Sequence, residues 1–154
     1  MEGYPMLKQM YEALLDQPLA AIEFEKLDQF IKQAKRENNQ EYVYNGYMLQ
    51  LDYFIELGRL DETLESALKI LQKMDSEQYP TFYIGLLDRI IYVYIQRKNF
   101  KAAYRYVFKK RNHINLDDYA AVNRWYLEMS YVYAELNETS RALLNLQAIL
   151  ENSP

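Results

Sequence analysis

Three short stretches decide the fold: GRLDETL at residues 58–64, KNFKAAY at residues 98–104 and NETSRAL at residues 137–143. Each stretch begins with residues suited to a turn and continues into a helix-forming run. The starting positions lie 40 and 39 residues apart, and one more step of 40 residues back reaches Pro18, where PLAAI opens a similar run. Four turns at one spacing predict a chain built from repeated helix pairs.

The segments between these turns have helical periodicity. Large apolar residues recur every four positions before the turn at residue 98, at Phe82, Leu86, Ile90 and Tyr94. Residues 90–95 alone have the composition of a buried strand, but they lie inside an apolar run of about 18 residues, which is too long for a strand. The fold class predicted for this chain is therefore all-α.

The stop and start signals place eight helices in one domain that spans residues 1–154. We expect helices at residues 6–16, 19–38, 42–57, 60–75, 80–97, 99–112, 117–136 and 139–151, paired into units 6–38, 42–75, 80–112 and 117–151. Gly58 is expected to end a helix, and Pro80 to lie in a first turn. The expected capping residues are Asp61, Asp117 and either Asn137 or Thr139.

Composition narrows the class of function. The 154 residues include no cysteine and one histidine, so disulfides, zinc ribbons and thiol nucleophiles are excluded. No run is apolar and long enough for a membrane span, and the N-terminus does not resemble a secretion signal, so we expect a cytoplasmic protein. The net charge of −4 argues against general affinity for nucleic acid or membranes.

No combination of residues in the sequence suggests catalysis. The single histidine, His113, lies at the end of a predicted helix, where its interaction with the helix dipole is the ordinary explanation. Phosphate-binding glycine loops, nucleophile elbows and metalloprotease motifs do not occur. We therefore expect a protein that is not an enzyme and that needs no metal or cofactor.

The later units resemble tetratricopeptide repeats whose helices are longer than usual. The resemblance is carried by large residues in the first helix of a pair, by small residues after the turn and by a proline at the end of the repeat: Leu87, Ile90, Tyr94, Tyr126, Met129, Tyr133, Ala103, Ala142 and Pro154. Gln50 and Thr63 depart from the pattern, and the first unit matches only by its turn. The resemblance implies a right-handed α-solenoid of about four antiparallel helix hairpins.

The same resemblance implies a concave groove lined by the first helix of each pair. The residues at the groove positions are Asn45, Met48, Asp52, Asp88, Tyr92, Arg124, Leu127 and Tyr131. Such a surface suits a peptide or a partner helix, and the mixture of charged, aromatic and apolar residues is typical of interface anchors. The alternative for Met48, Tyr92, Leu127 and Tyr131 is a role in packing.

The sequence predicts two further surface features, a stripe of basic residues and a rim of tyrosines. Residues 97–113 carry seven cations and no carboxylate, whereas the rest of the chain has 11 cations and 22 acids. Lys101, Arg105 and Lys109, four residues apart, form a stripe that is either a solvated face or a contact for an acidic partner. A rim of tyrosines at one edge of the groove is a further hypothesis, formed by Tyr42, Tyr44, Tyr83 and Tyr119.

These observations lead to one main functional hypothesis and two alternatives. The main hypothesis is a regulatory or adaptor module that binds a protein segment in its groove. The first alternative is a receptor for a short signalling peptide. The second is an assembly domain, in which the apolar helix 139–151 is covered by a second copy or by further repeats of a longer protein of which this is the N-terminal part.

Overall fold

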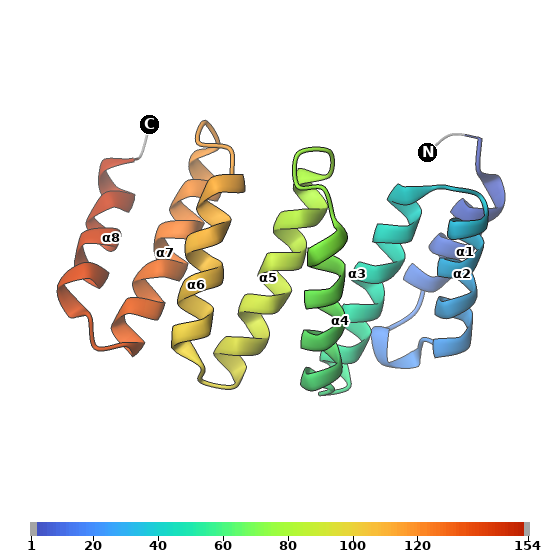
Figure 1. Cartoon of the computed structure of the whole chain (residues 1–154), viewed down its shortest axis with the longest axis horizontal. Coiled ribbons are helices and arrows are strands. Elements are labelled where there is room, and N and C mark those ends of the chain that lie inside the picture. The colour runs from blue at the N-terminus through green and yellow to red at the C-terminus, as the bar shows by residue number, and fades with distance from the viewer. Residues whose placement is uncertain (1–2, 153–154) are drawn as a thin grey trace. The chain divides into compact units, whose positions relative to one another are not determined.

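The computed structural model describes residues 3–152, and these residues contain helices but no strand (Figure 1). The all-α class predicted from the sequence is therefore confirmed. The α-helices are α1 (Pro5–Leu15), α2 (Phe24–Arg36), α3 (Gln40–Glu56), α4 (Leu60–Lys73), α5 (Pro80–Gln96), α6 (Phe100–Lys110), α7 (Tyr119–Glu135) and α8 (Thr139–Glu151). Two 3₁₀ helices accompany them, η1 (Leu19–Ala21) and η2 (Arg111–His113).

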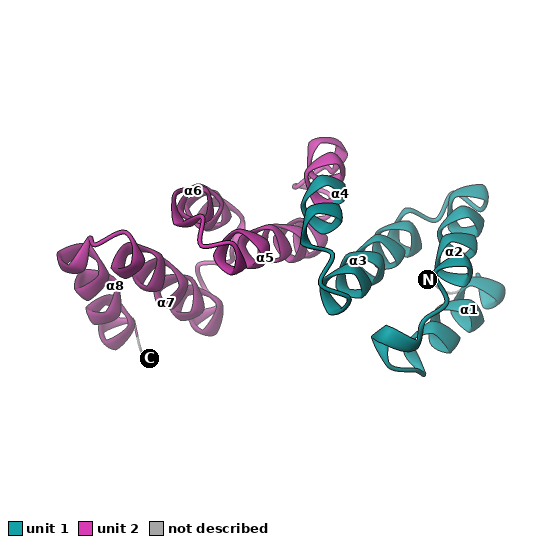
Figure 2. Ribbon diagram, turned by 90° about the horizontal axis from the view of Figure 1, so that it is seen from below, with its two compact units in different colours: residues 1–66 teal, residues 67–154 magenta. Residues whose placement is uncertain are grey.

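The chain divides into two compact units, residues 1–66 and residues 67–154, and the division falls within α4 (Figure 2). Unit 1 contains α1, η1, α2, α3 and the first half of α4. Unit 2 contains the second half of α4, α5, α6, η2, α7 and α8. None of the described helices has the combination of length and apolar character that crossing a membrane requires.

Three of the four turns that the sequence pattern identified share one backbone arrangement, whereas the fourth, at Pro18, is extended and leads into η1. Gly58, Lys98 and Asn137 have φ angles of 74°, 57° and 62°, so each is in the left-handed region. The next residue donates its amide hydrogen to a carbonyl five positions earlier: Arg59 to Phe54, Asn99 to Tyr94 and Glu138 to Tyr133, at 2.8–2.9 Å. This is the Schellman arrangement, which ends a helix by satisfying carbonyls that have no helical partner.

The same arrangement occurs between α2 and α3. Asn38 has a φ of 54°, and the amide of Asn39 donates to the carbonyl of Ala34 at 3.0 Å. A left-handed residue other than glycine is disfavoured, so only the turn at Gly58 is free of that cost. The other three turns have Asn38, Lys98 and Asn137 at the left-handed position. The four turns therefore share a backbone arrangement and not a glycine.

Close packing of α2 against α3 organises unit 1. A methyl group added to Gly46 would lie 2.6 Å from Cγ1 of Ile31 and 3.3 Å from the ring of Phe30, so only glycine allows this approach. The ring centroid of Phe30 lies 5.5 Å from that of Tyr11 and 5.8 Å from that of Tyr42, and the two tyrosine rings are 5.9 Å apart, so the three rings form one cluster. The core of unit 1 therefore depends on aromatic contacts across three helices.

The core of unit 2 lies where α6 packs against α5 and α7. Ala103 and Val107 of α6 have no exposed surface. The indole N–H of the single tryptophan, Trp125 on α7, donates to the carbonyl of Val107 at 2.6 Å. Next to this bond the guanidinium of Arg111 lies 4.9 Å from the centre of the Trp125 ring. Trp125 thus joins α7 to the end of α6.

Several predicted boundaries are wrong. The helix expected at 19–38 is broken, because Ile22 and Glu23 are extended and the buried side chain of Ile22 belongs to the core of unit 1. The cap of α7 is Asp118 rather than Asp117, and it accepts from the amide of Ala121 at 3.1 Å. The N-cap residue of α8 is Glu138, and its side chain makes no capping bond.

The α3 boundary also differs, because α3 begins at Gln40, after Asn39, whose side chain accepts from the amide of Tyr42. Pro80 and Gly58 have the roles expected of them.

Candidate functional site

The five predicted groove residues of unit 2 form two stripes, one on α5 and one on α7. Asp88 and Tyr92 are four residues apart on α5, and Arg124, Leu127 and Tyr131 follow at intervals of three and four on α7. Such intervals place residues on one face of a helix. Tyr92, Leu127 and Tyr131 are 43%, 55% and 46% exposed, and Arg124 is also exposed. We call these five residues the α5/α7 face.

The three predicted groove residues of unit 1 all lie on α3. Asn45 and Asp52 are half-buried. Met48 is only 8% exposed, so its thioether belongs to the packed interior, which corrects its assignment to partner binding in favour of the packing alternative. The chemistry described below therefore concerns unit 2.

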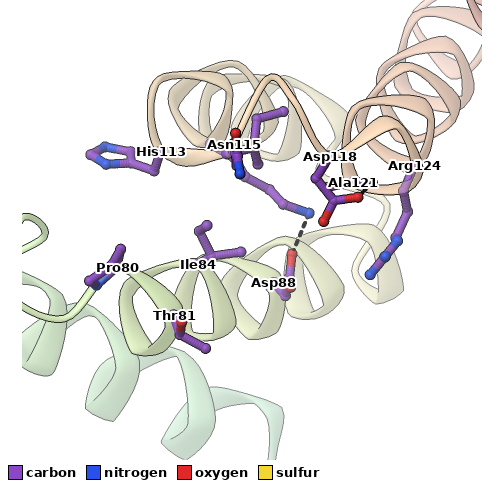
Figure 3. Close-up of a pocket in the computed structure, with 11 residues that line it drawn as sticks. Pro80, Thr81, Ile84, Asp88, His113, Asn115, Asp118, Ala121 and Arg124 are labelled. Carbon is purple, nitrogen blue, oxygen red and sulfur yellow. Dashed lines mark hydrogen bonds and ion pairs between the residues drawn. The ribbon is translucent and has the colours of Figure 1, made fainter. Parts of the chain in front are cut away.

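A polar pocket of about 300 Å³ opens at one end of the α5/α7 face (Figure 3). Asp88 and Ile84 line it from α5, His113 and Asn115 from the segment between α6 and α7, and Asp118 and Arg124 from the start of α7. The complete lining is Pro80, Thr81, Ile84, Asp88, Lys110, His113, Ile114, Asn115, Asp118, Ala121 and Arg124. Both signs of charge and neutral hydrogen-bonding groups therefore converge on one small volume.

Lys110 is the central residue of this pocket. Its side chain is 6% exposed, and its ammonium lies 2.6 Å from Oδ1 of Asp88 on α5 and 2.8 Å from Oε1 of Glu128 on α7. Burial lowers the pKa of Lys110, but the hydrogen bonds and charges of Asp88 and Glu128 outweigh burial, and the pKa is raised overall. Lys110 is therefore a cation at neutral pH, and it links α5, α6 and α7 through two ion pairs.

The sequence contains a signal for this buried lysine that the charge pattern of residues 97–113 does not reveal. Lys110 follows Ala103 and Val107 at intervals of seven and three, which places it on the buried face of α6. The predicted basic stripe lies on another part of the helix. Lys101, Arg105 and Lys109 are all exposed, as both a solvated face and a contact for an acidic partner require.

His113 lies at the outer end of the pocket. Its ring centroid is 4.5 Å from that of Tyr83. Burial, together with the positive charge of Lys109, lowers the pKa of His113 below its usual value. The imidazole is therefore neutral at physiological pH and can both donate and accept hydrogen bonds. It adds no charge to the pocket.

Two charged side chains of the pocket retain bonding capacity. Asp118 uses one carboxylate oxygen to cap α7. Arg124 takes part in no ion pair with any residue between 3 and 152, and its guanidinium is exposed. The pocket can therefore bind a polar or charged group of another molecule, whereas Lys110 already has two partners.

An apolar hollow of about 520 Å³ lies at the other end of the α5/α7 face. Its lining includes Ile95 of α5, Leu127 and Tyr131 of α7 and Leu146 of α8, together with Glu128, Ser130, Ala134 and Ala142. Leu146 is 42% exposed, so apolar surface faces water on both α7 and α8. The α5/α7 face thus changes from polar to apolar along the length of its helices.

The predicted rim of tyrosines is wrong for three of its four members. Tyr42, Tyr44 and Tyr83 are 2%, 7% and 7% exposed, so they are packing residues, whereas Tyr119 is 48% exposed. Tyr94 and Tyr133, two of the residues that carry the resemblance to tetratricopeptide repeats, are half-buried, and burial raises the pKa of both phenols.

No group of three or more histidine, aspartate or glutamate side chains with the spacing of a metal site occurs in the described part of the chain. Comparison with known proteins gives no further guide to the chemistry: no protein-family model, no curated protein and no solved structure matches this chain.

Proposed function

We propose that this protein is a non-catalytic interaction module of the tetratricopeptide-like type, and that the α5/α7 face binds a segment of another protein. The helix-repeat part of the proposal is supported by the Schellman turns after α3, α5 and α7, which recur at the spacing of the sequence repeat. The right-handed solenoid and its four hairpins are part of the same proposal.

The observation that carries the binding proposal is the exposure of Tyr92, Leu127 and Tyr131. These large side chains, one on α5 and two on successive turns of α7, are about half exposed, so they leave apolar surface in water. Aromatic and arginine side chains are also the residues that most often anchor protein interfaces. Arg124 precedes Leu127 by one helical turn, so a charged anchor adjoins the apolar ones.

The length of the α5/α7 face indicates that the bound part of the partner is short. Arg124 and Tyr131 are seven residues apart, which is about 10 Å along a helix. Two turns of a partner helix or about three residues of an extended peptide cover that distance. The partner that suits this face carries a polar or charged group at the pocket and one or two large apolar side chains at the hollow.

The test is a selection of peptides from a random displayed library on the immobilised protein. Peptides that bind wild-type protein are compared on two variants, Leu127→Asp and Leu116→Asp. Leu116 is 61% exposed in the loop before α7 and lines neither the pocket nor the hollow, so it controls for adding a carboxylate to an exposed leucine. We expect Leu127→Asp to weaken binding at least tenfold and Leu116→Asp to leave it unchanged.

The polar pocket favours a second candidate function, a receptor for a short signalling peptide. A volume of about 300 Å³ accommodates one side chain or one chain terminus. A free peptide that binds there should raise the thermal unfolding temperature in a saturable manner, because it binds only the folded state. Loss of that increase in Arg124→Ala would support the receptor function, and an unchanged increase would contradict it.

A further inference from the structure

The outer surface of α8 carries a row of exposed leucines. Leu143, Leu146 and Leu150 are 60%, 42% and 79% exposed. They are separated by three and four residues, so they form one continuous row along about two turns of the helix. The buried residue of α8 is Ala142, which faces α7. Few surfaces of this length on a protein that functions as a monomer are so apolar.

The leucine row continues into the apolar hollow. Leu146 belongs to both, because it lines the hollow together with Leu127 and Tyr131 of α7. The row and the hollow therefore form one surface that offers a ridge, Leu143 and Leu150, beside a depression. A ridge beside a depression on the same molecule is the requirement for a self-complementary contact between two identical copies.

The distribution of charge also suits a second copy. In a two-fold contact, a charge near the axis meets the same charge of the partner, so a self-complementary surface must be uncharged there. The charged residues within α8, Arg141 and Glu151, lie about 100° or more from the leucine row at 3.6 residues per turn. Glu128, at the floor of the hollow, is already paired with Lys110.

The apolar area is adequate for a stable contact. Leu143, Leu146 and Leu150, with Leu127 and Tyr131, expose on the order of 500 Å² of side-chain surface per copy, within the range of functional patches on monomers. Two copies would then bury about 1,000 Å², which reaches the lower limit for a specific interface. A dimer of moderate strength, with a dissociation constant in the micromolar range, agrees with an area of this size.

We propose that two copies of this chain associate through α8, with the leucine row of each copy packed against the hollow of the other. The observations behind this self-association are separate from those behind partner binding. The two events would compete, because the dimer and the partner proposed above both use Leu127 and Tyr131 at the hollow.

The test is sedimentation equilibrium of the full chain from low micromolar to several hundred micromolar concentration. Two variants are compared with the wild type: Leu150→Asp, in the row, and Leu144→Asp as the matched control. Leu144 is 63% exposed but points about 100° or more away from the row. Both leucines are exposed, so circular dichroism should show the same helical content for both variants.

We expect the wild type and Leu144→Asp to change from one to two chains with rising concentration. The dissociation constant of Leu150→Asp should be at least tenfold higher. A wild-type mass of one chain at all concentrations, growth beyond two chains, or equal weakening by both variants would overturn the proposal. Peptides selected on the α5/α7 face should still bind Leu150→Asp, so failure of the dimer and failure of partner binding are distinguishable.

Discussion

Lys110→Met removes the charge that Asp88 and Glu128 share, and it keeps an unbranched side chain in the space between α5 and α7. Removing one member of a buried ion pair destabilises a protein by about 3–5 kcal/mol, because the remaining charge stays buried without a partner. Here the carboxylates are partly hydrated, since the side chain of Asp88 is 44% exposed and that of Glu128 is 26% exposed. We therefore expect the free energy of unfolding to fall by about 2–3 kcal/mol.

The assay is urea unfolding at pH 7, followed by the fluorescence of Trp125, which reports on unit 2 directly. Lys109→Met is the matched control, because Lys109 is the exposed neighbour and its loss should change the stability by less than about 0.5 kcal/mol. Replacing all three charged residues together, as Asp88→Asn, Lys110→Met and Glu128→Gln, should restore part of the lost stability, since no unpaired charge then remains. Equal effects of Lys110→Met and Lys109→Met would refute the structural role assigned to Lys110.

The pH dependence of the same variant follows from the direction of the pKa shift. The folded-state pKa of Lys110 is raised above its ordinary value of 10.5. From neutral pH to about pH 10.5 the ion pairs therefore contribute their full stabilisation, and this contribution is lost as the pH rises through the folded-state pKa of Lys110. The difference in stability between wild type and Lys110→Met should be constant across that range and should decrease in strongly alkaline solution.

Three other substitutions test the fold. Gly46→Ala should lower the stability by about 1–3 kcal/mol in thermal or urea unfolding, although alanine favours helix, because its methyl group would lie 2.6 Å from Ile31; unchanged or higher stability would contradict the close packing of α2 and α3. Trp125→Phe should cost about 1–3 kcal/mol by leaving the Val107 carbonyl without its donor, a loss that hydrogen exchange at the end of α6 would localise. Asn99→Ala, which removes the side-chain cap of α6, should cost about 1 kcal/mol, and Asn112→Ala, an exposed site, serves as its control in urea unfolding.

The helices and their turns could be predicted because short-range chemistry determines them. The apolar period before Lys98 is helical whatever surrounds it. Gly58 and Asn137 belong to the residue types that adopt a left-handed backbone most readily, whereas Lys98 does so without that preference. The break before α2 was missed because Ile22 and Glu23 have no local signal for an extended backbone. The burial of Ile22 in the core of unit 1, which is a tertiary contact, accounts for it.

The site was harder to predict than the fold, because it depends on which side chains of different helices meet. Asp88 and Arg124 could be assigned to one surface from the repeat, but the pairing of Asp88 with Lys110 joins residues 22 positions apart. Treating residues 97–113 as a uniform basic segment concealed the one lysine that faces inward. Likewise, tyrosine composition alone does not distinguish Tyr83, which is buried, from Tyr92, which is exposed.

Amide chemical-shift mapping determines whether the α5/α7 face is the surface where this protein binds a partner. A peptide obtained by the library selection is titrated into ¹⁵N-labelled protein. We expect the largest shifts at Tyr92, Arg124, Leu127 and Tyr131, and we expect them to saturate. Shifts confined to Lys101, Arg105 and Lys109 on α6, or the failure of every selected peptide to shift the α5/α7 face, would contradict this expectation.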